Sequence, residues 1–233
     1  MLARVRSGAL RGIDALVVDV EVDVSTGLPH TTTVGLPDGA VREATDRIRA
    51  ALRNAGFEYP TRRVTVNLAP AGVRKEGPHY DLSIALGILA AEAKPPLPDL
   101  GPWCVLGELG LDGRVHDVRG ALPIAAAARR AGLAAMLVPA ANAAEAALAG
   151  GPPVFGVETL AEAVTHLRGN SREPVTVDAA ALLAVAPLAA GDLADVRGQP
   201  HAKRALEVAA AGGHNVLLFG SIVNYSASSS KPR

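Results

Sequence analysis

Hydrophobic and polar residues alternate in two different rhythms along the first third of the chain. Over residues 18–24 every second residue is valine and the residues between are acidic, which predicts a β-strand with one buried and one solvated face. Apolar residues then recur at helical spacing over residues 41–52. This stretch lies between Asp38, a typical N-cap residue, and Gly56, which suits a helix C-terminus. Residues 63–68 predict a further strand.

Strand and helix patterns continue to alternate up to about residue 169. Asp81 has the residue type of an N-cap, and residues 82–93 after it, which are apolar nearly all round, predict a buried helix. A turn at residues 111–113 separates extended stretches at 104–109 and 114–118, which predicts a hairpin. The other predicted strands are 33–34, 134–138 and 154–157, and the other predicted helices are 121–131, 141–148 and 160–167. Such alternation predicts an α/β fold with parallel pairing, formed by a first domain of residues 1–169.

A second unit is expected after a connecting segment. Residues 170–191 read as an interdomain linker, in which residues 179–190 regain a helical composition. Residues 192–220 then begin a new pattern, with a predicted helix over 199–211 and a short buried strand over 215–219.

The chain changes character after Gly220. Residues 221–233 read SIVNYSASSSKPR and have no apolar periodicity. A domain that has only reached its first central strand cannot complete a sheet in such a segment. We therefore expect residues 192–220 to be the truncated start of a second domain, and residues 221–233 to be a disordered tail. A frameshift, a gene-model artefact or an early truncation would each produce such a tail.

The amino-acid composition excludes several classes of protein. Of the 233 residues, 49% are hydrophobic and 20% are charged, as in ordinary globular proteins. Aromatic residues make up only 3%, which argues against a surface that stacks single-stranded nucleic-acid bases. Lys plus Arg and Asp plus Glu both number 23, so the net charge indicates neither nucleic acid nor an anionic membrane. We expect a cytoplasmic protein, because no stretch resembles a membrane span or the apolar core of a signal peptide.

The metal-binding residue types give no sign of a metal site. Cys104 is the single cysteine, which excludes an internal disulfide and a cysteine-rich zinc site. The histidines are scattered, and no pair has the spacing of metal ligands on one helix. We therefore expect no metal ligands.

Two segments contain residue types that are typical of catalytic or nucleotide-binding sites. In the polar stretch before the apolar helix, His79, Asp81 and Ser83 could form the nucleophile group of a serine peptidase. The simpler interpretation is that Asp81 caps the helix and Ser83 lies inside it. Gly220 follows a buried strand, as in a phosphate-binding loop, but residues 221–225 supply neither a second glycine nor a Gly-Lys pair.

Several motifs occur together in a specific order. They are VGLPDGAV (34–41), NLAPA (67–71), KEGPHYDLSIAL (75–86), GELGLDGRV (107–115) and DLADVRGQPH (192–201). With them the chain resembles the magnesium-chelatase-like AAA+ ATPases of the ComM/YifB family over residues 1 to about 220.

The resemblance implies a fold and a function. It implies an N-terminal domain with the fold of the Lon protease proteolytic domain, followed by an AAA+ motor similar to the ATPase subunit of magnesium chelatase. For full-length members it implies ATP and magnesium as cofactors. It also implies DNA as a partner, a hexameric homo-oligomer and a helicase activity that drives branch migration in natural transformation, or competence.

The residues that match a Lon-type active site lack its chemistry. Lon-type domains place the nucleophilic serine in a Lys-Asp-Gly-Pro-Ser-Ala-Gly run, and the matching run here puts His79 at the serine position. Leu122 stands at the position of the partner lysine, and Ser83 lies four residues beyond His79. Because a serine needs an adjacent base to become a nucleophile, the resemblance implies no catalytic residues here.

The start of the motor also departs from the family. Family members continue Phe219-Gly220 with Pro-Pro-Gly-Ser-Gly-Lys-Thr, where this chain has Ser-Ile-Val-Asn-Tyr. The segment 196–201 resembles the part of such ATPases that lies beside the adenine. The resemblance therefore implies a weak remnant nucleotide site, made by Val196, Gly198, Gln199, His201 and Gly220.

Together these features predict a binding or assembly module without ATPase or peptidase activity, which binds no cofactor and is a monomer or a weak oligomer. Two other functions stay open. One is a subunit similar to the magnesium-chelatase ATPase, and the other is a Lon-like serine peptidase that uses Ser83.

Overall fold

The computed structural model describes residues 1–92, 94–170, 172–178 and 192–218. The chain divides into two compact units, Met1–Ala179 and Ala180–Arg233.

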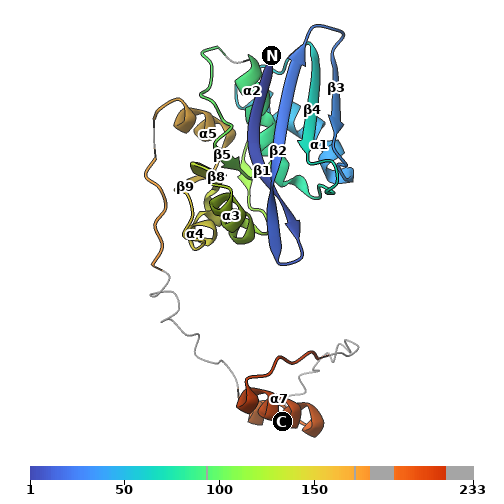
Figure 1. The fold of residues 1–233 in the computed structure, drawn as a ribbon, viewed down its shortest axis with the longest axis vertical. Helices are drawn as coiled ribbons and strands as arrows, with labels where there is room; N and C mark the ends of the chain where they lie inside the picture. The colour runs from blue at the N-terminus through green and yellow to red at the C-terminus, as the bar shows by residue number, and fades with distance from the viewer. Residues whose placement is uncertain (93, 171, 179–191, 219–233) are drawn as a thin grey trace, which may run out of the picture. The chain divides into compact units, whose positions relative to one another are not determined.

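The first unit is built on one large mixed sheet with helices against it (Figure 1). Its strands are β1 (Leu2–Arg11), β2 (Asp14–Ser25), β3 (His30–Val34), β4 (Arg63–Ala69), β5 (Trp103–Val105), β8 (Ala135–Pro139) and β9 (Val154–Val157), and β6 (Glu108–Leu109) and β7 (Val115–His116) form a separate hairpin. Its helices are α1 (Gly39–Asn54), the short 3-10 helix η1 (Pro78–Tyr80), α2 (Asp81–Glu92), α3 (Ala121–Arg130), α4 (Ala140–Ala147) and α5 (Leu160–Leu167).

The seven strands of the large sheet run in the order β3-β4-β2-β1-β5-β8-β9. The pairings β3–β4, β1–β5, β5–β8 and β8–β9 are parallel, whereas β1–β2 and β2–β4 are antiparallel. The predicted α/β fold with parallel pairing is therefore confirmed.

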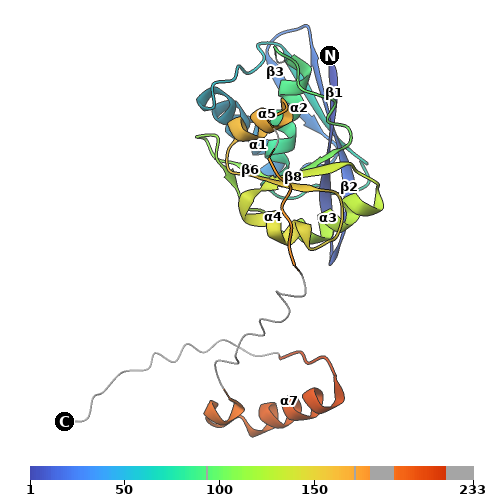
Figure 2. The ribbon, with the colours of Figure 1, turned by 90° about the vertical axis from the view of Figure 1, so that its left-hand side faces the viewer.

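Helices pack on both faces of the sheet, as two close contacts show. A Cβ atom on Gly87 of α2 would lie 2.6 Å from Cγ2 of Val22, whereas a Cβ atom on Gly8 of β1 would lie 2.4 Å from Cγ2 of Ile124 in α3. Val5 of β1 also contacts Gly87. Because side chains alternate along a strand, Val5 and Gly8 of β1 face opposite sides of the sheet. Helix α2 therefore covers one face and α3 the other, as the perpendicular views of Figures 1 and 2 allow the reader to follow.

The two halves of the sheet are covered differently. Around β5 and β8 one core cluster packs with α2 and α5, and a second packs with α3 and α4, so this parallel half is buried on both faces. In the antiparallel half, α1 and α2 cover one face, and four alternating valines of β2 point toward them, namely Val18, Val20, Val22 and Val24. The opposite face carries cross-strand ion pairs such as Arg4–Glu21, at 2.7 Å. The predicted strand with one solvated face is confirmed.

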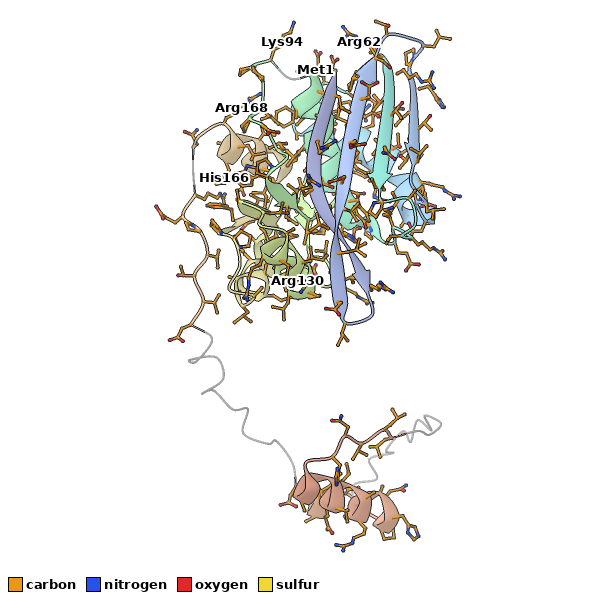
Figure 3. All side chains as sticks on the ribbon, viewed as in Figure 1. Met1, Arg62, Lys94, Arg130, His166 and Arg168 are labelled. Atoms are coloured by element: carbon orange, nitrogen blue, oxygen red, sulfur yellow. The ribbon has the colours of Figure 1, made fainter. Side chains whose placement is uncertain are left out.

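Helix α3 is also fastened at its C-terminal end. The guanidinium of Arg130 donates a hydrogen bond to the carbonyl of Ala15 at 3.1 Å, near the β1–β2 turn (Figure 3). At the other end of the same strand pair, the N-terminal ammonium of Met1 hydrogen-bonds to the carbonyl of Val24.

The outer edge of β9 is occupied by the chain after α5. The backbone N–H of Val175 donates to the carbonyl of Val154 at 2.8 Å. The guanidinium of Arg172 donates to the carbonyl of Gly156 at 3.1 Å, and its backbone N–H donates to Nδ1 of the buried His166 at 3.1 Å (Figure 3). This part of the expected linker is thus packed within the first unit.

The local structure agrees with the sequence-based prediction at α1 and differs from it at β1 and β5. Asp38 caps α1 through a 2.9 Å bond from the N–H of Val41 to its carboxylate, and Gly56 follows the helix with φ 82°, as predicted. Strand β1 was not predicted, because small residues such as Gly8 and Ala9 interrupt its alternation. The stretch predicted as one strand over 104–109 is divided at Gly107, whose φ of 156° turns the chain from β5 into β6.

The second unit is described over residues 192–218. It contains η2 (Leu193–Asp195), opened by a capping box between Asp192 and Asp195, and α7 (Pro200–Gly212). The predicted helix 199–211 is confirmed. Of the strand predicted over 215–219, residues 215–218 have no strand structure, and residue 219 lies outside the described residues. A strand needs a neighbour to satisfy its backbone groups, and these residues are exposed. The predicted helical stretch 179–190 lies outside the described residues.

The close contact of α2 with the sheet leads to a stability prediction. We expect Gly87→Ala to lower the free energy of unfolding by about 1–2 kcal/mol, because the stiff, buried Val22 has to move, and overpacking of this kind costs more than the helix propensity of alanine returns. Gly39→Ala in α1 is the matched control, because its Cβ meets nothing within 4 Å. Urea denaturation followed by circular dichroism measures both changes. Equal stability of the two variants would contradict the packing argument.

Candidate functional site

The wall of the candidate site is the loop between β4 and η1, which two side chains hold in place. Asp38 not only caps α1 but also accepts a hydrogen bond from the N–H of Gly77 at 3.0 Å through its second oxygen. The ammonium of Lys75 is fully buried and donates to the carbonyl of Pro70, which closes the loop on itself. Burial lowers the pKa of Lys75. This lysine is therefore a structural residue of the loop.

His79 lies where this loop enters η1, and it is 7% exposed. Its Nε2 is 2.8 Å from the carbonyl oxygen of Gly8. Because a carbonyl only accepts, Nε2 carries the proton and Nδ1 of the neutral ring is an acceptor. Burial lowers the pKa of His79, so the neutral ring is the form present at pH 7.

His79 forms part of the lining of a cleft with a volume of about 960 Å³. Its walls come from the end of β1, the loop before η1, β6 and the segment that precedes α3. The lining residues are Leu10, Arg11, Gly72, Val73, Arg74, Glu76, Gly77, Pro78, His79, Glu108, Asp117, Val118 and Arg119. Three arginines and three carboxylates surround the cleft, so its charges balance. Of these, Arg74 and Glu76 form an exposed ion pair at 3.1 Å.

Asp81 lies behind the cleft and joins three elements. Its carboxylate accepts two hydrogen bonds from the guanidinium of Arg47 on α1, at 2.9 and 3.1 Å, and one from the N–H of Leu109 in β6, at 3.3 Å. The predicted N-cap is therefore wrong: Asp81 is the first residue of α2, and its side chain turns to Arg47 rather than to its own backbone. The tertiary partner is a charged donor, which forms a stronger hydrogen bond than a backbone N–H.

The three residues of the possible nucleophile group do not act together. His79 faces the cleft, Asp81 binds Arg47, and the fully buried Ser83 donates from Oγ to the carbonyl of Tyr80 at 2.8 Å. Leu122, at the position of the Lon-type lysine, is a partly exposed residue of α3 whose backbone N–H donates to Glu145 at 3.1 Å. The cleft lining thus contains a histidine acceptor and arginine donors, and it contains no serine or lysine.

The residues expected to form a remnant nucleotide site lie in the second unit. Val196, Gly198, Gln199 and His201 are exposed around the start of α7, where Gln199 is the N-cap with φ 55°. Gly220 lies outside the described residues. The structure therefore brings four of the five together along one segment.

Within the part of the chain that the structure describes, no group of three or more His, Cys, Asp or Glu side chains could hold a metal ion. In that same part, no helix is long and apolar enough to cross a membrane.

Sequence reasoning missed part of the cleft. Arg11, Glu108, Asp117 and Arg119 come from three separate segments and carry no local motif that marks them as site residues. Only the loop with His79 had been singled out, because it is the most polar stretch of its region. The folded sheet brings these segments together.

The chain matches known protein families in two places. Residues 20–142 match the family described as subunit ChlI of Mg-chelatase, and residues 192–223 match magnesium chelatase, subunit ChlI. The first match covers more than half of the chain. This chain therefore belongs to the ChlI family, and its relatives show that it is a ComM/YifB-like member of it.

Those relatives are similar over nearly the whole chain. It is 45% identical over 219 residues to an uncharacterized protein of Mycobacterium tuberculosis, 42% identical over 221 residues to the competence protein ComM of Haemophilus influenzae, and 40% identical over 221 residues to the uncharacterized protein YifB of Escherichia coli. These alignments cover 94% of this chain but only 42–43% of each relative. A weaker similarity, 28% identity over 134 residues, connects it to the Lon protease of Clostridioides difficile and covers 54% of this chain and 17% of that protein.

The buried Asp81 predicts a particular pH dependence of stability. Burial raises its pKa to about 6 from an ordinary 3.8, against the opposing effect of Arg47. A carboxyl group that holds its proton more tightly in the folded state makes the unfolding free energy fall as the pH rises between these two values. We expect the stability of the wild type relative to Asp81→Asn to fall by up to about 3 kcal/mol between about pH 4 and pH 6.

Urea denaturation at several pH values measures this difference. The exposed Asp46→Asn on α1 is the control, because it removes a carboxyl group that lies outside the buried pair. A stability difference between wild type and Asp81→Asn that stays constant or rises over this range would contradict the assignment.

Proposed function

We propose that this chain combines a non-catalytic, Lon-like binding module with the beginning of the AAA+ motor of a ComM/YifB-like ATPase. In this proposal residues 1–169 form the Lon-like domain, residues 170–191 the linker and residues 192–220 the start of the motor, with 221–233 as a tail. The two ChlI matches, which fall on residues 20–142 and 192–223, support the division. The Lon similarity supports the kinship of the first domain with a proteolytic domain.

The observation that carries the non-catalytic role is the chemistry of the cleft. His79 stands at the position of the Lon-type serine, with Nε2 bound to the Gly8 carbonyl. The nearby Ser83 is buried, and its hydroxyl is bound to its own helix turn. A serine peptidase needs a nucleophile and a base in mutual contact at an open site. This cleft instead offers hydrogen-bonding and charged groups suited to holding a ligand.

For the whole protein we propose an ATP- and magnesium-dependent motor that acts on DNA as a hexameric ring in the cytoplasm. The similarity to a protein named competence protein ComM supports an action on DNA, because competence is the uptake of DNA. The alternative of a magnesium-chelatase subunit has the family description in its favour. The similarity to ComM and YifB over 94% of the chain favours the DNA motor.

For the chain as given, we propose little or no ATP hydrolysis. The sequence after Gly220 contains no Gly-Lys pair, and Val196, Gly198, Gln199 and His201 supply no phosphate-binding loop. Without the N–H groups and the lysine that hold phosphates, such a site loses most of its affinity for nucleotide.

A peptidase assay tests the role of the cleft. We expect the wild type and Ser83→Ala to cleave casein and fluorogenic peptides no faster than buffer, because the Ser83 hydroxyl is buried and no lysine lines the cleft. Hydrolysis by the wild type that disappears in Ser83→Ala would overturn the non-catalytic assignment and restore the peptidase.

A nucleotide titration tests the second unit. We expect isothermal calorimetry to detect no magnesium-dependent binding of ATP in the micromolar range, since the phosphate-binding groups are missing from the sequence after Gly220. His201→Ala serves as the comparison. Micromolar, magnesium-dependent affinity in the wild type that is reduced in His201→Ala would show that the segment around α7 forms a working site.

A further inference from the structure

The large sheet has a gap beside the end of β1, because the β1–β2 hairpin projects beyond the end of β5 (Figure 1). Strands β1 and β5 pair at a single position, Arg6 with Cys104. The chain then turns away from β1 at Gly107, whose N–H donates to the carbonyl of His79 at 3.0 Å. Among the described residues, no strand pairs with β1 on this side beyond Arg6. The cleft of about 960 Å³ borders this part of β1 at Leu10.

The turn between β1 and β2 determines which way the main chain of Leu10 faces. The turn has two residues, and Gly12 at its first position has φ 62°, as in a type II′ hairpin. The flanking pair Arg11–Asp14 is therefore hydrogen-bonded, and such pairs alternate along an antiparallel ladder with pairs that are not. The next pair, Leu10–Ala15, is of the second kind, so the N–H and C=O groups of each residue point away from the other strand.

Two side-chain hydrogen bonds agree with this orientation. The outward carbonyl of Ala15 accepts from the guanidinium of Arg130 at 3.1 Å. The carbonyl of Gly8, which faces the same side of β1 as that of Leu10, accepts from Nε2 of His79 at 2.8 Å. At Leu10 itself, no described residue takes the corresponding place. Its N–H and C=O groups are therefore open to the cleft.

A second polar group without a partner belongs to the same cleft. His79 is 7% exposed and lines the cleft, and its Nε2 is bound to Gly8. Nδ1 has no hydrogen-bond partner among the described residues. It is also absent from the fully enclosed side-chain atoms without a partner in that part of the chain, so it is reached from the cleft. The cleft thus contains an acceptor at His79 and a main-chain donor and acceptor at Leu10.

The lining distinguishes between classes of ligand. Its three arginines and three carboxylates balance, which does not favour a polyanion such as a nucleic acid. Apart from His79 it contains no aromatic ring on which a base could stack. The open main-chain groups of a strand are matched by the main chain of another polypeptide, which carries a donor and an acceptor at the same spacing. Side chains of both signs can pair with the charged lining.

We propose that the cleft binds an extended segment of another polypeptide, which pairs with β1 at Leu10 and donates a main-chain N–H to Nδ1 of His79. This inference rests on the proposed function of the first domain as a binding module, and it names the class of ligand. An extended chain advances roughly 3.3 Å per residue, so a segment paired at Leu10 arrives beside Gly8 and His79 within two residues. The cleft volume of about 960 Å³ suits a short segment of this kind, because ligand sites typically measure roughly 300–1,000 Å³.

Fluorescence anisotropy of the full chain with an unfolded polypeptide tests the proposal. The probe is fluorescein-labelled α-lactalbumin that has been reduced and carboxymethylated so that it stays unfolded, and the folded form is the comparison. We expect saturable binding of the unfolded probe and at least about tenfold weaker binding of the folded form, because only an extended chain offers free N–H and C=O groups. No saturable binding of the unfolded probe, or equal binding of both forms, would overturn the proposal.

A matched pair of variants tests the pairing at β1. Leu10→Pro and Leu10→Ala both lose the leucine side chain, but only proline lacks the main-chain N–H. The ladder with β2 does not use this N–H, so the hairpin can accept proline here. We expect Leu10→Pro to bind the unfolded probe at least about fivefold more weakly than Leu10→Ala. Equal affinities of two variants that circular dichroism shows to be folded would exclude pairing at Leu10.

A second pair keeps the proposal testable if the proline variant does not fold. In place of His79, glutamine keeps both a donor for the Gly8 carbonyl and an acceptor for the ligand, whereas leucine keeps neither. We expect His79→Leu to bind the unfolded probe several-fold more weakly than His79→Gln. Equal affinities would show that His79 does not contact the ligand and would overturn the proposal.

The same assay identifies other occupants. Labelled duplex DNA whose binding weakens in Leu10→Pro relative to Leu10→Ala would assign the cleft to nucleic acid and overturn the proposal. Gel electrophoresis of the probe separates this inference from the proposed function. Cleavage of the probe would contradict the non-catalytic role, whereas an intact probe that is not bound would contradict only the inference about polypeptide.

Discussion

The bidentate ion pair between Arg47 and Asp81 is the interaction on which the arrangement of the first unit depends. It joins α1 to the first residue of α2, and the same carboxylate accepts the N–H of Leu109 in β6. Removing Arg47 would leave the fully buried Asp81 carboxylate without its charged partner, which destabilises the folded state. The pair therefore holds the start of α2, and with it η1 and His79, at a defined distance from the sheet.

The same region of the molecule holds one wall of the cleft in place. The loop in front of η1 is fastened by Asp38 and by the buried Lys75, so its backbone is held before any ligand arrives. His79 is oriented by its bond to Gly8, and burial lowers the pKa of its ring. Groups held in advance in this way lose little entropy on binding, which favours affinity. The residues that line the cleft include no serine and no lysine.

The parallel and antiparallel halves of the sheet differ in which of their faces are covered by helices. Its parallel half, around β5 and β8, is buried between helices on both faces. One face of its antiparallel half is covered by α1 and α2; the other carries α3 near the β1–β2 turn and ion pairs such as Arg4–Glu21 further along, and this half ends in the edge strand β3. One edge of the sheet is thus closed by the chain's own continuation, whereas β3 forms the other edge.

The sequence by itself determined the local elements and the family. The valine alternation of residues 18–24, the cap at Asp38 and the apolar helix near residue 82 are recognisable because each depends on neighbours within a few residues. The ComM/YifB resemblance is also recognisable from the sequence, because each of its motifs is a short run of residues and the motifs occur in a specific order. Strand β1 was not predicted because Gly8 and Ala9 interrupt its alternation of polar and apolar residues. A larger residue at position 8 would collide with Ile124, which is more than a hundred residues away in the sequence.

Only the tertiary structure decided which partners these elements have. Asp81 reads as an N-cap in sequence, but the fold brings Arg47 within 2.9 Å and the stronger, charged donor takes the carboxylate. The cleft likewise gathers Arg11, Glu108 and Arg119 around His79 from segments that no local pattern connects. Short-range periodicity reflects the geometry of single helices and strands, whereas a site is made by contacts between residues far apart in the chain.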